Sequence, residues 1–168
     1  RNDSAPALLW PQAGHFTLSV RCDFDYRQRF DQCGFLIYLD SENWFKASIE
    51  HEDGRIARLG SVVTNLGYSD WATTDIPGTD HMYYRLSRRG PDFLIEYSVD
   101  GCEFRQMRVF HLHRLGETDP ALAAQALPEG DAPAIPLGLY ACSPLASSFT
   151  ARFSELSLEP CLWQGHGA

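Results

Sequence analysis

A short stretch of alternating residues carries the side chains best suited to holding a ligand. In a β-strand, side chains two positions apart point to the same face. Four residues of different chemistry then share one face: Trp44, Lys46, Ser48 and Glu50. An aromatic ring, a cation, a hydroxyl and a carboxylate together can stack on a sugar or polar metabolite and hydrogen-bond to it. The alternative is a solvated outer face, where Lys46 and Glu50 pair with neighbours on adjacent strands.

A second candidate group follows in the chain. The segment Asn65 to Asp80 is rich in Gly, Ser, Asp, Thr and Pro, which predicts a long loop. It contains Asp70 and Trp71, and loops on a rigid scaffold are where binding groups usually lie. Both residues are therefore candidate ligand contacts, although Trp71 could instead pack the loop onto the rest of the fold.

Arg85 adds a possible counter-charge. It shares a strand face with Ser87, so it could be a buried partner for Glu50 or Asp70. Such a trio could be a structural ion network as easily as a ligand clamp.

The familiar catalytic and metal patterns are missing. A glycosidase needs two carboxylates spaced across a sugar ring, and the one-strand arrangement Glu-x-Asp-x-x-Glu does not occur. No catalytic residue is therefore assigned; the enzymatic alternative, a glycan hydrolase or lyase using Glu50 and Asp70, needs these groups within about 10 Å. His111 and His113 lack a third ligand, so no metal site is predicted. No phosphate loop, dinucleotide fingerprint or nucleophile elbow occurs, and no cofactor is predicted.

The elements that must position these side chains are β-strands. Turn signals at short intervals, with apolar alternation between them, predict an all-β sandwich of about nine strands. The predicted strands are Phe16–Phe24, Gly34–Asp40, Trp44–His51, Ile56–Leu59 running on to Ser61–Thr64, Met82–Arg88, Phe93–Val99, Cys102–Leu112, Leu137–Ser143 and Ser148–Leu158. Asp100-Gly101 predicts a two-residue hairpin turn. Residues 118–133 are interpreted as a loop or short-helix insertion, with the helix over Pro120–Leu127, within a single domain spanning 1–168.

Composition narrows the partners. The 168 residues carry a formal net charge of −8, which argues against a nucleic-acid partner because phosphate binding needs a basic surface. The five cysteines are odd in number and form no C-x-x-C pair, which favours a reducing, cytoplasmic compartment. No stretch approaches the ~18 apolar residues that span a bilayer, so no membrane association is predicted.

Several segments occur together in an order and spacing that is typical of one family. They are Asp31-Gln32-Cys33-Gly34-Phe35, Asn43-Trp44-Phe45-Lys46 with Glu50, Ser61-Val62-Val63-Thr64, Ser69-Asp70-Trp71, Ser98-Val99-Asp100-Gly101 and Gly138-Leu139-Tyr140-Ala141-Cys142-Ser143-Pro144. From about Gly14 to Leu158 the chain resembles the family called domain of unknown function 1349, also labelled regulation of enolase protein 1 (concanavalin A-like). The resemblance implies a concanavalin A-like jelly-roll sandwich of two antiparallel sheets. It also implies a stand-alone cytoplasmic protein without an assigned activity.

The family motifs gather on the polar face and the loop, which favours a pocket on the concave sheet. With Arg85 added, the predicted ligand-binding residues are Trp44, Lys46, Glu50, Ser61, Thr64, Asp70, Trp71, Arg85 and Ser143. Two departures stand out. The segment that family members carry before Gly14 is absent or replaced, which questions whether the sandwich edge is complete, and the stretch over 118–133 is longer than expected.

Three functions are compatible with these patterns. The first is a non-enzymatic module that binds a carbohydrate or a small polar metabolite on the concave sheet. The second is the hydrolase or lyase described above. The third is a regulatory protein-interaction domain working through a sheet face or the 118–133 insertion.

Overall fold

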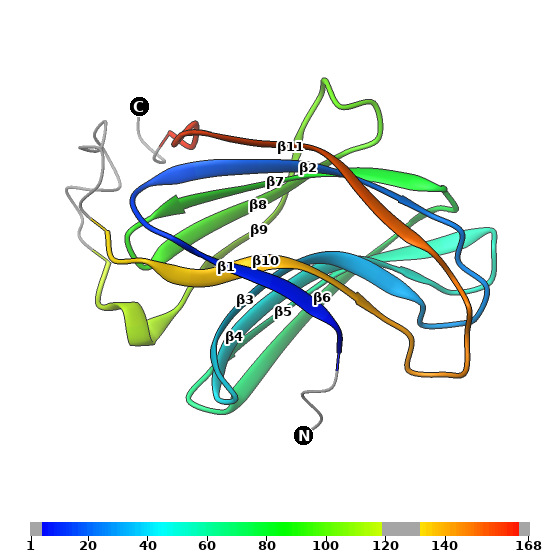
Figure 1. Ribbon diagram of the computed structural model, residues 1–168, viewed down its shortest axis with the longest axis horizontal. Coiled ribbons are helices and arrows are strands. Elements are labelled where there is room, and N and C mark those ends of the chain that lie inside the picture. Colours follow the sequence, from blue (N-terminus) through cyan, green and yellow to red (C-terminus); the bar gives the residue numbers. More distant parts are fainter. Residues whose placement is uncertain (1–4, 119–131, 165–168) are drawn as a thin grey trace.

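Two antiparallel β-sheets face each other in the computed structural model, which describes residues 5–118 and 132–164 (Figure 1). The six-stranded sheet runs, edge to edge, β1 (Ala7–Gln12), β10 (Ile135–Cys142), β3 (Gln32–Asp40), β4 (Asn43–His51), β5 (Ile56–Asn65) and β6 (Tyr68–Pro77). The five-stranded sheet runs β11 (Ala151–Pro160), β2 (Phe16–Phe24), β7 (His81–Arg89), β8 (Asp92–Ser98) and β9 (Arg105–His111). The predicted all-β sandwich of two antiparallel sheets is confirmed.

Helical structure is minimal in this part of the chain. A 3-10 turn, η1 (His113–Leu115), follows β9. No helix among the described residues is both long enough and apolar enough to cross a membrane. The predicted helix Pro120–Leu127 lies outside the described residues.

The core between the sheets fixes the orientation of β4. Phe45, Ala47 and Ile49 are fully buried and point toward the five-stranded sheet. The ring of Phe45 stacks on that of Phe110 in β9, with centroids 3.7 Å apart. Because alternate side chains of a strand point to opposite faces, the even-numbered residues of β4 point away from the core.

The outward face of the six-stranded sheet, called here the open face, is built by register. Lys46 lies opposite Leu36 in β3 and Val62 in β5, and Val62 lies opposite Trp71 in β6. The open face carries the outward side chains of five strands: Tyr140 and Cys142; Gln32, Leu36 and Tyr38; Trp44, Lys46, Ser48 and Glu50; Arg58, Val62 and Thr64; Ser69, Trp71, Thr73 and Asp75.

The loop predicted over Asn65 to Asp80 is wrong, because most of it forms the edge strand β6. A tight turn at Leu66 and Gly67 joins it to β5, and both residues have positive φ, 51° and 81°. The Gly67 N–H donates to the Glu42 carbonyl at 2.9 Å, which ties this turn to the preceding hairpin. An edge strand is solvated along its length, so its residues have the polar composition of a loop.

The two-residue turn predicted at Asp100-Gly101 is also wrong. The connection from β8 to β9 spans residues 99–104. The Asp100 carboxylate accepts hydrogen bonds from the backbone N–H groups of Cys102 and Glu103, at 2.8 and 2.9 Å. The Asp100 side chain therefore accepts the hydrogen bonds that close this turn, where a two-residue hairpin would close through backbone–backbone hydrogen bonds. The strand β9 begins only at Arg105.

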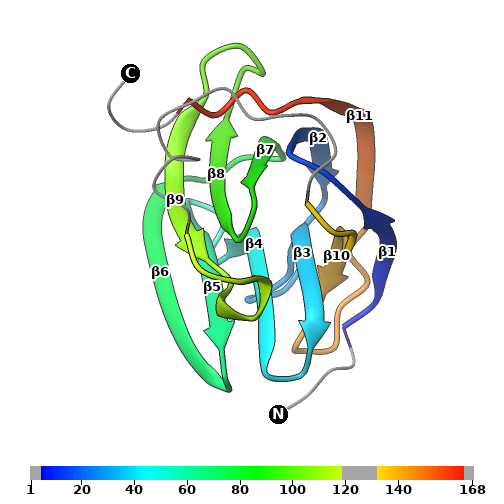
Figure 2. The same ribbon diagram turned by 90° about the vertical axis from the view of Figure 1, so that its left-hand side faces the viewer.

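The sandwich edge that the sequence left in question is occupied. β1 pairs with β10 in antiparallel register, with Trp10 opposite Leu137. Figure 2 shows β1 and β6 at the two edges of the six-stranded sheet.

Two glycines on this sheet differ in how closely the backbone approaches them. A Cβ on Gly34 would overlap the carbonyl oxygen of Ala47, whereas a Cβ on Gly60 would meet the Trp71 indole nitrogen at 3.6 Å. We expect Gly34→Ala to lower the free energy of unfolding by about 1–3 kcal/mol. The matched change Gly60→Ala should stay within about 0.5 kcal/mol of wild type. Denaturant unfolding measures both, and equal effects would contradict the close approach at Gly34.

Candidate functional site

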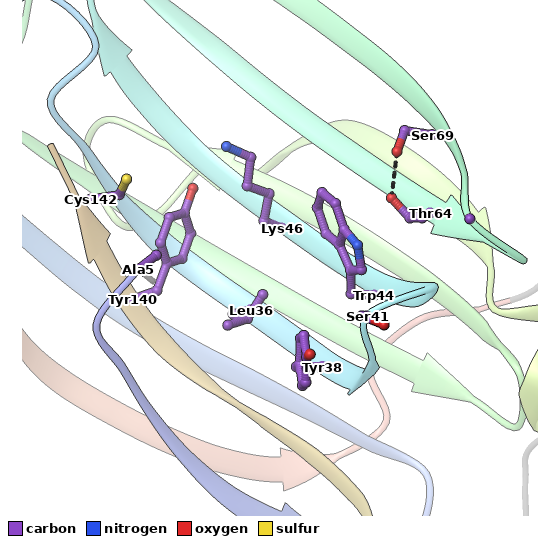
Figure 3. A pocket seen from close by; sticks show the side chains of 11 residues that line it. Ala5, Leu36, Tyr38, Ser41, Trp44, Lys46, Thr64, Ser69, Tyr140 and Cys142 are labelled. Carbon is purple, nitrogen blue, oxygen red and sulfur yellow. Dashed lines mark hydrogen bonds between the residues drawn. The ribbon is translucent and has the colours of Figure 1, made fainter. Parts of the chain in front are cut away.

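The open face is hollowed by a cavity of about 280 Å³ above β3 and β4 (Figure 3). Strand residues form its floor, and turn residues form part of its rim. Its lining residues are Ala5, Leu36, Tyr38, Ser41, Trp44, Lys46, Thr64, Gly67, Ser69, Tyr140 and Cys142. The volume lies near the lower end of ligand pockets, roughly 300 Å³, which suits a small molecule.

Aromatic rings flank a cation in this cavity. Trp44 is half-buried and lies opposite Tyr38 in β3 and Thr64 in β5. Figure 3 shows the Lys46 side chain between the rings of Trp44 and Tyr140. The Lys46 ammonium lies 5.9 Å from the centre of the Tyr140 ring. The ring of Trp44 is thus available for stacking, beside a donor of hydrogen bonds.

The buried amide of Gln32 organises the polar groups of the site. Its Oε1 accepts hydrogen bonds from the Lys46 ammonium at 2.7 Å and from the Tyr140 hydroxyl at 3.0 Å. Its Nε2 donates to Glu50 at 3.2 Å and to the Phe30 carbonyl at 3.1 Å. The Gln32 amide therefore lies between the Lys46 ammonium and the Glu50 carboxylate and hydrogen-bonds to both.

Burial sets the protonation of these groups. It lowers the pKa of Lys46, against the opposing influence of Cys142 and Glu50, and it raises the pKa of Glu50, against that of Lys46. Burial also raises the pKa of the Tyr140 hydroxyl and of the Cys142 thiol. The site therefore offers neutral Tyr and Cys groups next to a partly desolvated ammonium.

A shallow depression adjoins the cavity on the side of β5 and β6. Its lining residues are Gln32, Lys46, Ser48, Glu50, Arg58, Gly60, Val62, Trp71 and Thr73. Trp71 is 62% exposed and rises from the edge strand on the same face as Lys46. Of the two candidate contacts predicted on a loop, Trp71 lines this depression from the strand β6.

The structure brings together some of the predicted ligand-binding residues. Trp44, Lys46 and Thr64 line the cavity, and Glu50 and Trp71 line the depression beside it. Thr64 shares a 2.8 Å hydrogen bond with the hydroxyl of Ser69.

Ser61 lies elsewhere. It sits opposite Ala47 on the core face of β5 and is buried between the sheets. Its predicted place in the pocket is wrong, because Val62 and not Ser61 takes the outward position.

Ser143 acts behind the site, where it holds the buried carboxylate of Asp31. Its hydroxyl donates to Asp31 at 2.6 Å, and Ser147 donates at 2.7 Å. The backbone N–H groups of Arg27 and Gln28 each donate at 2.9 Å. Burial works to raise the pKa of Asp31, but these hydrogen bonds together outweigh it and hold the pKa below its ordinary value. Ser143 thus fixes the residue that precedes Gln32 and does not line the cavity.

Arg85 and Asp70 have other partners. Arg85 belongs to the five-stranded sheet, where it donates to Glu96 at 2.7 Å. Asp70 is an exposed residue paired with Arg108 of β9 at 2.7 Å. The predicted pairing of Arg85 with Glu50 or Asp70 is wrong, because strand alternation does not reveal to which sheet a strand belongs.

The register also separates the two carboxylates of the enzymatic alternative. Asp70 lies opposite Val63, which lies opposite Phe45, five residues before Glu50 on the same strand. At about 3.3 Å per residue, the backbone positions of Asp70 and Glu50 lie about 16 Å apart along the strand direction, and Asp70 points to the other face of the sheet. This exceeds the separation of a glycosidase pair, about 5–10 Å, so the predicted acid and base are not brought together.

The two histidines near the end of β9 have structural contacts. The Nδ1 atom of His111 lies 2.8 Å from the Asp92 carboxylate, and its ring centre is 6.2 Å from that of His113. Within residues 5–118 and 132–164, no three His, Cys, Asp or Glu side chains gather as metal ligands.

Sequence reasoning missed several residues of the site. Gln32, Tyr140 and Cys142 lie in segments that carry the family resemblance, but only strand pairing shows that β3 lies beside β4 and that β10 lies beside β3. Leu36 and Tyr38 could have been found, because alternation places both on one face of their strand.

Comparison with known proteins identifies relatives that match most of the chain. The family model described as "Protein of unknown function (DUF1349)" matches residues 1–161. "Regulation of enolase protein 1" from Saccharomyces cerevisiae is 32% identical over 156 residues, covering 93% of this chain and 70% of the relative. A solved structure of a functionally unknown protein from Saccharomyces cerevisiae matches with a TM-score of 0.76 and 29% identity, over 96% of this chain and 78% of that one.

The fold is also similar to one part of larger proteins whose sequences are much less alike. Xylan beta-1,4-xylosidase from Bacillus halodurans C-125 matches with a TM-score of 0.69 at 11% identity, over 93% of this chain and 30% of that one. At this identity the likeness shows the shared fold alone.

The Asp31 carboxylate should stabilise the fold in a pH-dependent way. We expect Asp31→Asn to lower the free energy of unfolding by about 2–3 kcal/mol at pH 7. Since the folded pKa lies below the unfolded value of about 3.9, this stabilisation is present above that value. It is lost as pH falls through the lower folded pKa. Denaturant unfolding at pH 7 and pH 3 should therefore show a difference between the proteins that shrinks at the lower pH.

Asp75→Asn is the matched control, since this exposed carboxylate is paired with Arg58 at 3.7 Å. It should change stability by less than about 1 kcal/mol. An Asp31→Asn difference that does not depend on pH would contradict the assigned role.

Proposed function

Because the chain belongs to the family described as Protein of unknown function (DUF1349), whose fold alone assigns no activity, we propose a function from the site itself. The protein is a non-enzymatic cytoplasmic module that binds a carbohydrate or a small polar metabolite on the open face. The odd number and the spacing of its cysteines support the cytoplasmic compartment in this proposal.

One observation carries this proposal: a partly buried ammonium lies beside a half-buried indole inside a cavity. Lys46 and Trp44 both line the cavity and project from the same face of β4. An indole face stacks on the C–H groups of a sugar ring, and an ammonium donates to its oxygens. Holding a lysine out of water costs free energy, which a bound polar ligand would offset.

Hydroxyl groups at the other end of the cavity extend the same chemistry. Thr64 and Ser69 line the cavity and hydrogen-bond to each other at 2.8 Å. A hydroxyl both donates and accepts, so this pair can also engage a ligand hydroxyl. The arrangement suits a ligand with an apolar ring face and polar groups at both ends.

The proposal assigns no catalytic residue. Glu50 accepts a hydrogen bond from Gln32. Asp70, the carboxylate predicted as its catalytic partner, lies about 16 Å away along the sheet. Binding alone needs no second carboxylate.

A thermal-shift and calorimetric screen of monosaccharides and small polar metabolites tests the proposal. At least one compound should raise the melting temperature, and Trp44→Ala should weaken its binding about ten-fold through the lost stacking. Tyr83→Ala, which removes an aromatic side chain from the outer face of the five-stranded sheet, should leave the affinity unchanged. The proposal fails if no compound shifts the melting temperature or if Trp44→Ala binds as well as wild type.

A regulatory protein-interaction domain is a second candidate, favoured by exposed side chains next to the β5–β6 turn. Tyr68 is 84% exposed and Leu66 is 60% exposed. Exposed aromatic residues of this kind are typical of contact surfaces. The name of the yeast relative describes regulation of enolase, so enolase is the first partner to test.

Purified enolase and the full chain should then form a complex that Tyr68→Ser weakens at least ten-fold. Leu8→Ser is the matched control, since Leu8 is 68% exposed at the opposite edge of the sheet. Analytical ultracentrifugation or calorimetry measures the affinities. Absence of binding by wild type, or equal loss with both variants, removes this candidate.

A further inference from the structure

The cavity carries a charge opposite to that of the protein. The chain has a formal net charge of −8, yet Lys46 is the single charged side chain among the described residues that line the cavity. Within a cavity bounded by protein, the electric field of one charge is less screened than on an open surface. The cavity is therefore a positive site in an acidic molecule.

The ammonium of Lys46 has unused hydrogen-bonding capacity. In the described part of the chain, it donates one hydrogen bond, to Gln32 Oε1, and it takes part in none of the ion pairs. An ammonium group has three N–H donors. Two of its donors therefore have no protein acceptor among residues 5–118 and 132–164, and Lys46 lines the cavity in which a ligand could supply one.

The neighbouring acidic groups do not neutralise this charge directly. Glu50 accepts from the Nε2 of Gln32, so the amide stands between the two charges. Burial raises the pKa of the Cys142 thiol, which keeps it protonated. Burial also lowers the pKa of Lys46, as expected for an ammonium that leaves water without a direct counter-ion.

We propose that the ligand of the cavity is a sugar acid, a hydroxylated ring with one carboxylate that accepts hydrogen bonds from Lys46. This deepens the proposed function and rests on it. One ammonium matches one negative charge. A phosphate carries nearly two charges and three acceptor oxygens, for which the lining offers a single cation.

The spacing of the floor fits such a ligand. Lys46 lies two residues from Trp44 on the same strand face, and Thr64 is opposite Trp44. Two residues of a strand span about 7 Å, which is comparable to the length of a six-membered sugar ring with its substituents. With the carboxylate at Lys46, the ring lies against Trp44 and its far hydroxyls reach Thr64 and Ser69 (Figure 3).

Calorimetry of the full chain with matched sugars tests this assignment. The pairs are glucuronate with glucose and galacturonate with galactose, and glucose 6-phosphate represents the phosphate class. At least one acid should bind ten-fold or more tightly than its neutral partner and more tightly than glucose 6-phosphate. Lys46→Met should weaken binding of the acid at least ten-fold more than binding of its neutral partner, which removes the preference, and Lys46→Arg should restore part of it.

Arg58→Met is the matched control, because it removes one positive charge from the open face outside the cavity. It should leave the preference for the acid unchanged, and equal loss in both variants would overturn the role of Lys46. Equal affinities for acid and neutral sugars overturn the carboxylate assignment but leave the proposed function standing. Tighter binding of glucose 6-phosphate overturns it in favour of phosphate. If wild type binds neither these sugars nor any metabolite of the wider screen, the proposed function itself fails.

Discussion

In a β-sheet, a shift of one residue between neighbouring strands turns every side chain of the shifted strand to the other face. In β4 such a shift would place Phe45, Ala47 and Ile49 in water and Trp44 and Lys46 in the core. Stacking of Phe45 on Phe110 opposes it. Each large apolar side chain moved into water costs about 1.5–3 kcal/mol, and a buried, unpaired ammonium costs more. The core therefore positions the site, although Phe45, Ala47 and Ile49 themselves lie on the opposite face of β4.

Gln32 fixes the positions of the polar groups that this register places on the open face. Its Oε1 faces two donors, Lys46 and Tyr140, while its Nε2 faces two acceptors, Glu50 and the Phe30 carbonyl. The flipped amide would set its N–H donors against an ammonium and a hydroxyl, and its oxygen against a carboxylate. The two charges therefore hold the amide in one orientation, and the amide keeps them apart.

Alternation predicted the composition of each strand face, but not how strands are assembled. The period of two correctly separated Trp44, Lys46 and Glu50 from the buried side of β4. It could not do the same for Ser61, because Val62 and Val63 are apolar on both faces and conceal which one is buried. Arg85 and Asp70 were misplaced for a different reason: sheet membership and pairing are long-range properties. The polar sequence of β6 looked like a loop, since an edge strand has the same exposure to water as a loop.

Two hairpin turns meet at the rim of the cavity. The β5–β6 turn is bound to the β3–β4 turn, with the Gly67 N–H on the Glu42 carbonyl and the Leu66 N–H on Asn43. Ser41 and Gly67 from these turns line the cavity, while its floor belongs to the strands. Lengthening or exchanging the turns would therefore reshape the entrance without moving the Lys46 ammonium. The selectivity for ligand shape can then change while the group that anchors the ligand stays in place. A family built on this plan could keep one anchoring chemistry and still accept ligands of many shapes.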